Sequence, residues 1–150
     1  MRTSDRRALL EVVGLAAGYL GERVIDGIDV EVGTGEAVAI VGSNGAGKTT
    51  LFRAIAGLLP AIVGRVVFDG KDLTRRPAHR RSRAGIAYVP AERHLFPAMT
   101  VKTNLVLGAY PNRPDGETFE LVHDLFPRLK ERQRQQAGTL SGGEQQMLAV

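Results

Sequence analysis

The segment Gly42-Ser43-Asn44-Gly45-Ala46-Gly47-Lys48-Thr49 decides how this 150-residue chain folds. It fits the pattern G-x-x-x-x-G-K-[S/T] at every fixed position, and that pattern surrounds phosphate groups with backbone N–H groups. The glycines let the backbone curl inward, and a helix starting behind the loop adds the positive end of its dipole to the same hollow. A chance glycine-rich turn is the alternative, but four constrained positions make it rare. The segment therefore predicts a polyphosphate-binding loop.

The flanks of this loop supply the strand and the helix that the pattern needs. Residues 37–41 (AVAIV) form an unbroken apolar run, which predicts a central strand covered on both faces. Behind the loop, Leu51, Ile55 and either Leu58 or Leu59 recur at helical spacing. We expect this helix to begin near Lys48 and to end near Gly57.

Further elements follow from the same periodicities. Alternating or continuous apolar residues predict strands over 9–13, 28–32, 65–69 and 85–89. Helical spacing predicts helices over 77–84, 101–109 behind a Thr100 N-cap, and 117–129 with an interruption at Pro127, followed by a polar connector over 130–136. Strands precede helices along the chain, and the fold class is α/β.

Composition narrows the class of protein. The chain is 43% hydrophobic and 24% charged, and it contains no apolar run near the roughly 20 residues that cross a bilayer. Its first residues are too polar for a signal peptide, so we expect a cytoplasmic location. It has no cysteine, and its histidines (His79, His94 and His123) fit no metal-ligand spacing. Any metal must therefore be bound by oxygen ligands.

The net charge of +4 arises in one stretch. Residues 65–83 contain seven basic and two acidic residues, a net charge of +5. Such a stretch favours a solvated helix face or a contact to a protein partner. Nucleic acid is the alternative partner, but no aromatic residue alternates with these arginines as a base-stacking surface requires.

A second motif is the signature segment, Leu140–Gln146 (LSGGEQQ). Ser141 and Glu144 alone predict a capping box at the start of a helix. Capping leaves Gly142 and Gly143 unexplained, because glycine lowers helix stability there. Small residues at this point open the N–H groups of the first turn to a second anion.

With both motifs, the chain resembles the ATP-binding subunits of ABC transporters. The stretches HLFPAMTV, LVLGAY and LFPRLKERQRQQAGTLSGGEQQMLAV resemble the subfamily that serves branched-chain amino acid uptake. LTRRPAHRRSRAGIAYVP is also similar to urea and short-amide relatives, which leaves a second substrate class open.

The resemblance implies a P-loop NTPase fold of the ABC type, with a mixed β-sheet core and a helical subdomain. We expect the ATP-binding core over about 1–99, the helical subdomain over about 100–136, and the signature with the start of its helix over 137–150. It implies ATP and Mg²⁺ as ligands, with Thr49 on Mg²⁺ and Tyr19 stacked on adenine. The residues expected to bind ATP are Tyr19, Gly42, Ser43, Asn44, Gly45, Ala46, Gly47, Lys48, Thr49 and Thr50.

The resemblance further implies a dimer, in which the ATP of one subunit is bound by four signature residues of the other: Ser141, Gly142, Gly143 and Gln145. The expected partners are that second subunit, integral membrane permease subunits and, indirectly, a periplasmic binding protein, with no nucleic acid. The expected place is the inner face of the plasma membrane. A non-hydrolysing nucleotide-binding module is the alternative function.

The chain departs from the family at two points. The family places Gln or Glu after the proline at position 90, where this chain has Ala91, and Glu92 is the nearest replacement. The family also continues into a strand that ends in Asp-Glu, whereas this sequence ends at Val150. No catalytic residue is assignable, and we expect the chain as written neither to hydrolyse ATP rapidly nor to fold robustly.

Overall fold

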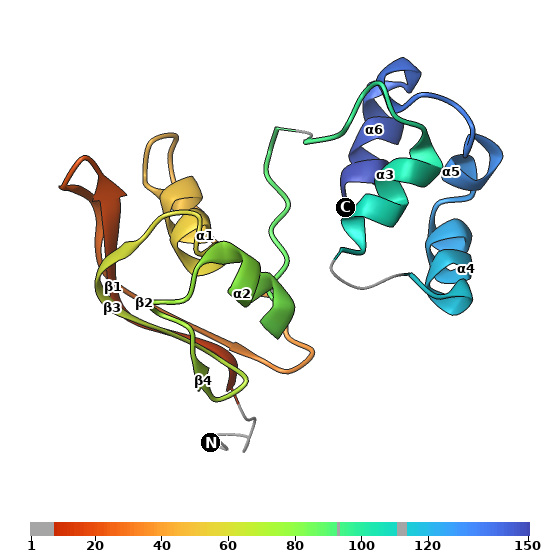
Figure 1. Ribbon diagram of the computed structural model, residues 1–150. Helices are drawn as coiled ribbons and strands as arrows, with labels where there is room; N and C mark the ends of the chain where they lie inside the picture. The colour runs from red at the N-terminus through yellow and green to blue at the C-terminus, as the bar shows by residue number, and fades with distance from the viewer. Residues whose placement is uncertain (1–7, 93, 111–113) are drawn as a thin grey trace. The chain divides into compact units, whose positions relative to one another are not determined.

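The computed structural model describes residues 8–92, 94–110 and 114–150 (Figure 1). The chain forms two compact units, one up to Tyr88 and the other Val89–Val150. Residues 1–7, on which the expected absence of a signal peptide partly rests, lie outside the described residues. No helix of the described part is long and apolar enough to cross a membrane.

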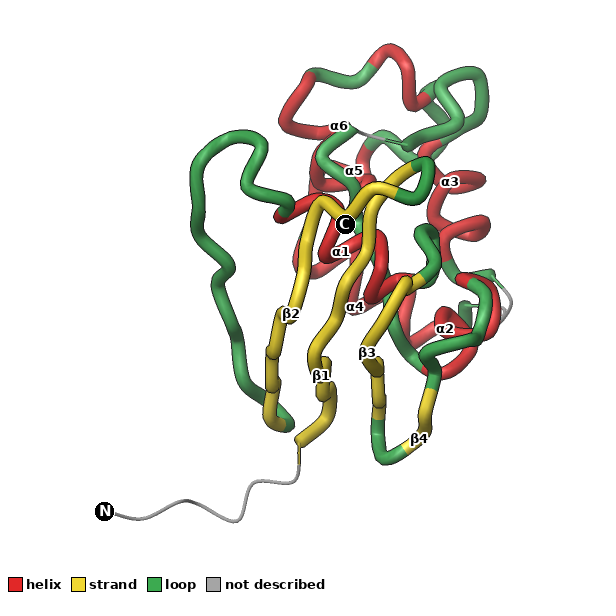
Figure 2. The backbone as a smooth tube through the Cα atoms, turned by 90° about the vertical axis from the view of Figure 1, so that its left-hand side faces the viewer, coloured by secondary structure: helices red, strands yellow, loops and turns green. Residues whose placement is uncertain are grey.

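The first unit is built on an antiparallel sheet of strands β1 (Ala8–Tyr19), β2 (Glu22–Gly33), β3 (Ala61–Phe68) and β4 (Lys71–Asp72). The strand order is β2-β1-β3-β4 (Figure 2). The predicted strands 9–13 and 28–32 lie inside β1 and β2, which pair from Ala8↔Gly33 to Tyr19↔Glu22 with register shifts along the ladder. A two-residue turn with positive φ at Leu20 and Gly21 joins them.

Helix α1 (Lys48–Ala56) confirms the predicted helix behind the glycine-rich loop. Leu51 and Ile55 are buried as predicted, and of the two alternatives Leu59 is buried whereas Leu58 is 56% exposed. These side chains pack on the sheet in a core with Val12, Leu15, Ala17, Ile25, Ala54 and Val66. The apolar face of α1 therefore fixes the loop at its N-terminus against β1 and β2.

Two predicted strands are wrong. Residues 37–41 and 85–89 belong to no strand, and Figure 2 shows the chain running from β2 to α1 as a loop. A strand exists only where another strand accepts its hydrogen bonds, and within the described residues the ladder contains β1 to β4 alone. Val38 is 44% exposed and Val41 89%, so the run is not covered on both faces. At the second wrongly predicted strand, Gly85 instead ends the helix over Ala78–Ala84, with a φ of 112°.

Helix α2 (Ala78–Ala84) confirms a helix in the basic stretch. The basic residues of 65–83 are exposed, as a solvated face requires, with one exception. Arg81 is only 1% exposed. Its guanidinium donates hydrogen bonds of 2.7–2.9 Å to the carbonyl oxygens of Ala54, Ile55, Thr74 and Arg76. Gly57, with a φ of +75°, makes room for it, because a Cβ there would lie 2.7 Å from Arg81 Nε. Arg81 is therefore a structural residue that joins α2 to the end of α1.

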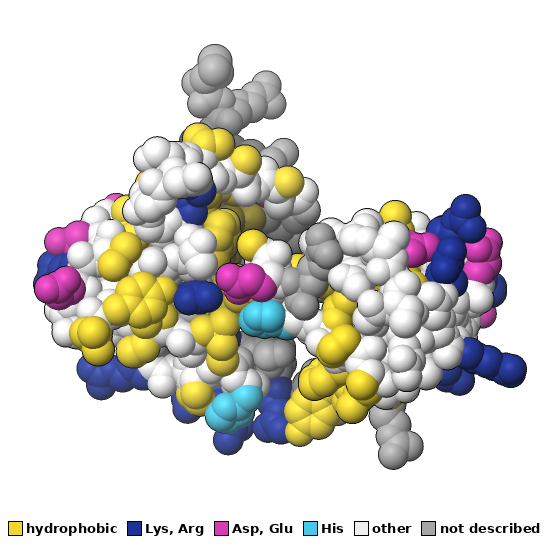
Figure 3. Space-filling view, turned by 90° about the horizontal axis from the view of Figure 1, so that it is seen from above, with side chains coloured by type: hydrophobic (Ala, Val, Ile, Leu, Met, Phe, Trp, Pro, Cys, Tyr) yellow, Lys and Arg dark blue, Asp and Glu magenta, His cyan; other side chains and the backbone are white. Residues whose placement is uncertain are grey.

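The second unit is helical. It contains α3 (Val101–Gly108), α4 (Gly116–Leu125), α5 (Pro127–Glu131), the short 3-10 helix η1 (Ala137–Thr139) and α6 (Gly142–Ala149). The Thr100 side chain caps α3, and the predicted interruption at Pro127 separates α4 from α5. The core of this unit is formed by Val101, Leu129, Ala137, Leu140 and Leu148. Hydrophobic side chains also reach the surface drawn in Figure 3.

Candidate functional site

The glycine-rich loop enters α1 through Gly47, the N-cap residue, at a φ of 88°. Only glycine adopts this left-handed conformation without strain. A Cβ at Gly47 would also lie 2.5 Å from Ile25 Cγ2 on β2, so the sheet closes the space behind the loop. The first turn of α1 contains no acidic residue, which leaves the positive end of the helix dipole uncompensated by a carboxylate.

Lys48 is the first residue of α1, and its side chain turns back into the loop. Its Nζ atom donates hydrogen bonds of 2.7 Å to the carbonyl oxygens of both Gly42 and Ser43. The Ala46 N–H closes the same turn with a 3.2 Å bond to the Ser43 carbonyl. The ammonium group and the first N–H groups of the helix thus belong to one small region.

A cavity of about 440 Å³ opens at this region. It is lined by Val24, Asn44, Gly45, Gly47, Lys48, Thr49 and Thr50. Val24 lies on β2, far from the loop in sequence, and sequence reasoning missed it because only the strand pairing places it there. Among the predicted loop residues, Gly42 and Ser43 contact Lys48 through their carbonyls and do not line the cavity.

Thr49 is the exposed hydroxyl of this cavity. Mg²⁺ prefers oxygen ligands and keeps several waters, so one hydroxyl beside phosphate oxygens fits its usual coordination. No cluster of at least three His, Cys, Asp or Glu side chains able to bind a metal occurs in the described part of the chain. The residues present therefore fit a Mg²⁺ ion that arrives with a phosphate ligand.

Tyr19 ends β1 and is 42% exposed. Its hydroxyl accepts a 3.4 Å hydrogen bond from Arg53 Nη1, and the Thr50 side chain lies beside it. The hydrogen bond from Arg53, followed by the neighbouring Thr50 hydroxyl, lowers the pKa of the Tyr19 phenol below its ordinary value. Thr50 thus lines the cavity and also lies beside Tyr19, the residue predicted to stack on adenine.

Arg53 is a second residue that sequence reasoning missed. Hydrogen bonds to Tyr19 and to Tyr88 raise the pKa of its guanidinium above the ordinary value. The sequence feature that could have predicted its position is spacing, because Arg53 follows Thr50 by three residues and both therefore lie on one face of α1.

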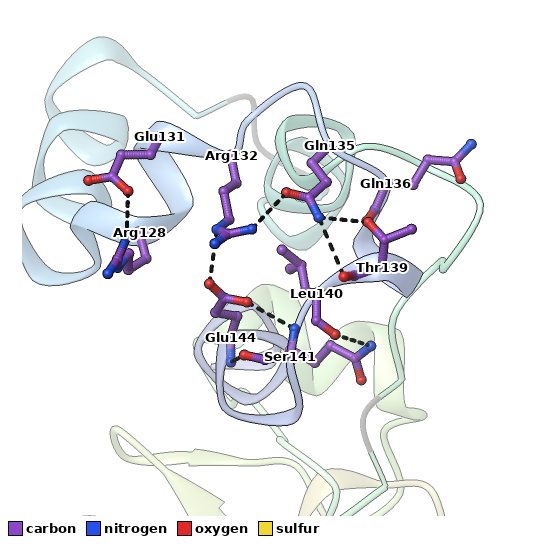
Figure 4. Close-up of polar contacts among 10 residues, drawn as sticks. Arg128, Glu131, Arg132, Gln135, Gln136, Thr139, Leu140, Ser141 and Glu144 are labelled. Carbon is purple, nitrogen blue, oxygen red and sulfur yellow. Dashed lines mark hydrogen bonds and ion pairs between the residues drawn. The ribbon is translucent and has the colours of Figure 1, made fainter.

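The signature segment begins helix α6 in the second unit (Figure 4). The predicted capping box is confirmed: Ser141 Oγ accepts a 3.4 Å bond from the Glu144 N–H, and Glu144 Oε2 accepts a 2.9 Å bond from the Ser141 N–H. Arg132 Nε lies 2.9 Å from Glu144 Oε1, and Arg132 also donates to Gln135. The connector before the signature therefore braces the start of α6.

The other predicted residues of this unit lie on its surface or turn inward. Ser141, Gly142 and Gly143 are exposed, and a Cβ at Gly143 would meet no atom within 4 Å. Gln145 Nε2 instead donates to the carbonyls of Leu140 and Ala137, at 3.2 and 3.4 Å. Ala91 and Glu92 are exposed, and the Glu92 carboxylate lies 3.7 Å from His94 Nε2.

Comparison with known proteins gives this geometry its context. The family model described as "ABC transporter" matches residues 25–150. The high-affinity branched-chain amino acid transport ATP-binding protein BraG of Pseudomonas aeruginosa is 42% identical over 135 residues, 88% of this chain and 58% of BraG. The probable branched-chain amino acid transport ATP-binding protein LivF of Archaeoglobus fulgidus is 38% identical over 144 residues, 95% of this chain and 61% of LivF.

A solved structure, described as the ATP binding subunit of an ABC transporter, matches with a TM-score of 0.81 at 30% identity. The match covers 94% of this chain and 59% of that chain. The chain thus spans about three-fifths of the length of the relatives that it matches. The α/β fold predicted from the sequence is confirmed.

Proposed function

The chain belongs to the ABC transporter family, and from this premise we propose that it is part of the ATP-binding subunit that energises import of branched-chain amino acids. The observation that carries the proposal is the cavity at the N-terminus of α1, where Lys48 and Thr49 meet the glycine-rich loop. The identities to BraG and LivF support the substrate class.

In this proposal the cavity binds the phosphates of ATP. The Lys48 ammonium exchanges its bonds to the Gly42 and Ser43 carbonyls for the β- and γ-phosphates, and Thr50 lies beside the α-phosphate. The Thr49 hydroxyl would hold Mg²⁺, which when bound would supply positive charge to neutralise the phosphates. Tyr19 stacks on the adenine ring. The remaining loop residues, Gly42 to Gly47, provide the curved backbone around the phosphates.

The signature segment would act on a second nucleotide. We propose that Ser141, Gly142, Gly143 and Gln145 contact ATP held by the Lys48 loop of a second ATP-binding subunit. The core would extend over about 1–99, the helical subdomain over about 100–136 and the signature over 137–150. Permease subunits in the plasma membrane, with the chain on their inner face, and a periplasmic binding protein complete the proposed assembly. We assign no residue to the hydrolytic step.

Substitution of Lys48 tests nucleotide binding. Lys48→Ala removes the one side-chain cation among the residues lining the cavity, so we expect Mg-ATP affinity to fall at least tenfold, about 1.4 kcal/mol. Lys71→Ala, a basic residue on β4 outside the cavity, is the matched control and should bind as the unmodified chain does. Titration with a fluorescent ATP analogue measures both variants. Equal affinities of the two variants would contradict the proposed site.

Deletion of the gene in its own organism tests the substrate class. We expect uptake of labelled leucine, isoleucine and valine to fall, while uptake of labelled urea and acetamide is retained. The opposite pattern would replace the proposal with the urea and short-amide alternative, which the 73–90 stretch favours.

A measurement of ATP hydrolysis tests the alternative of a non-hydrolysing module. The purified subunit is combined with vesicles that contain the permease, and ATP turnover is measured with and without Lys48→Ala. If Mg-ATP binds but no Lys48-dependent turnover occurs, the chain is a non-hydrolysing module.

A further inference from the structure

Four polar side chains of the first unit lie together beside the cavity. Arg53 Nη1 donates a 3.4 Å hydrogen bond to the Tyr19 hydroxyl, with Thr50 next to Tyr19 and Tyr88 next to Arg53. These residues come from three segments: the end of β1, one face of α1, and the end of the first unit.

Thr50 and Arg53 differ in their relation to the cavity. Thr50, beside Tyr19, is 5% exposed and lines the cavity. Arg53 does not line the cavity, and its side chain bonds to Tyr19 instead. We therefore expect the guanidinium of Arg53 to act on a ligand through the tyrosine.

Tyr19 needs such a contact to hold a defined orientation. It directly precedes the exposed turn at Leu20 and Gly21, and 42% of its surface is free of protein contacts. A half-exposed aromatic side chain changes rotamer on a fast timescale unless its polar end is fixed. The hydrogen bond from Arg53 restricts the ring, which reduces the entropy lost when a flat ligand stacks on it.

We propose that Arg53 is a positioning residue for recognition of the nucleotide base, because it holds the Tyr19 ring in the orientation that receives the base. This inference rests on the proposed function, in which Tyr19 stacks on adenine. Arg53 touches neither the base nor the phosphates. Its role concerns the base end of the ligand alone, and the phosphate loop works without it.

Two ligands separate this role from a structural one. We expect Arg53→Met to lower ATP affinity about three- to tenfold, the range expected for loss of one long, exposed hydrogen bond. Affinity for inorganic triphosphate, which has no base, should change less than twofold. Tyr19→Phe keeps the ring but removes the hydroxyl, so it should reproduce this selective loss. The double variant should lose no more than either single variant, because both remove the same contact.

The exposed Arg83 on α2 provides the matched control, and Arg83→Met should bind both ligands normally. Equal losses for ATP and triphosphate in Arg53→Met would overturn the inference in favour of a structural role. So would additive losses in the double variant. Because Tyr19→Phe preserves the packing of the ring, it tests the same contact if Arg53→Met does not fold.

Tyr19→Ala distinguishes failure of this inference from failure of the proposed function. If Tyr19→Ala binds ATP as tightly as the unmodified chain, Tyr19 does not stack on the base, and both proposals for it are wrong. If Tyr19→Ala selectively loses ATP while Arg53→Met does not, only the role of Arg53 is wrong. Selective loss in both variants supports the inference.

Discussion

Arg81 shows how one side chain couples two elements of the first unit. Its guanidinium bonds to carbonyl oxygens at the end of α1, where the negative end of the helix dipole favours a cation. The same group bonds to the carbonyls of Thr74 and Arg76 before α2. Burial lowers the pKa of this guanidinium, but arginine stays charged at any physiological pH.

Arg81→Met should lower the free energy of unfolding by about 2–4 kcal/mol, because buried carbonyls lose their donors. Arg81→Lys should also be destabilised, since a single ammonium cannot reach four carbonyls in the same fork geometry. Urea unfolding measures both variants, and Arg83→Met, on the exposed face of α2, should stay within about 0.5 kcal/mol. A loss no larger in Arg81→Met than in this control would contradict the structural role.

The start of helix α6 depends on a single carboxylate that has three polar neighbours. Glu144 bonds to the Ser141 N–H, caps the helix together with the Ser141 hydroxyl, and pairs with Arg132. The bonds to Ser141, followed by the Arg132 charge, hold the pKa of the Glu144 carboxyl below its ordinary value. The signature segment is therefore ordered by interactions that need Glu144 ionised.

The stability of this helix start should decrease in acid. A carboxyl whose pKa is lower in the folded state contributes stability above its unfolded pKa of about 4.3, and the contribution is lost as pH falls through the folded value. Amide exchange at Ser141 should therefore accelerate, relative to its intrinsic rate, below about pH 4. Glu144→Gln keeps an acceptor without a charge, so it should abolish this pH dependence. An unchanged profile in Glu144→Gln would contradict the assignment.

The described residues form two hydrophobic cores, one in each unit. The first contains Leu15, which is fully buried between the sheet and α1, and the second contains Leu129, which is fully buried among the helices. Each core is made only of residues from its own unit. Loss of packing in one core should therefore remain local.

Leu129→Ala should destabilise the second unit by about 2–5 kcal/mol, through lost burial and the cavity left behind. Hydrogen exchange should show reduced protection in α3, α5 and α6, with β1 and β2 unchanged. The reciprocal variant, Leu15→Ala, should reduce protection in β1, β2 and α1 only. Loss of protection throughout the chain in either variant would show that the units unfold as one.

Helix α1, its loop and the capping box of α6 could be predicted from the sequence. Their bonds join residues a few positions apart: Leu51 N–H to the Gly47 carbonyl, or Ser141 to Glu144. Glycine at 47 and 57 marks both ends of α1 for the same reason, since positive φ at a cap is a local requirement. Local interactions leave a periodic or motif signal, and such elements are predictable.

The remaining features depended on partners distant in sequence. Residues 37–41 have an apolar pattern but form no strand, because a strand is completed by hydrogen bonds from a neighbour that the pattern does not specify. Burial of Arg81 against the end of α1, the position of Val24 in the cavity and the contact of Arg53 with Tyr19 likewise arise between residues 20 to 34 positions apart. Only the folded chain brings these groups together, since each contact depends on how α1 and α2 pack beside the strands.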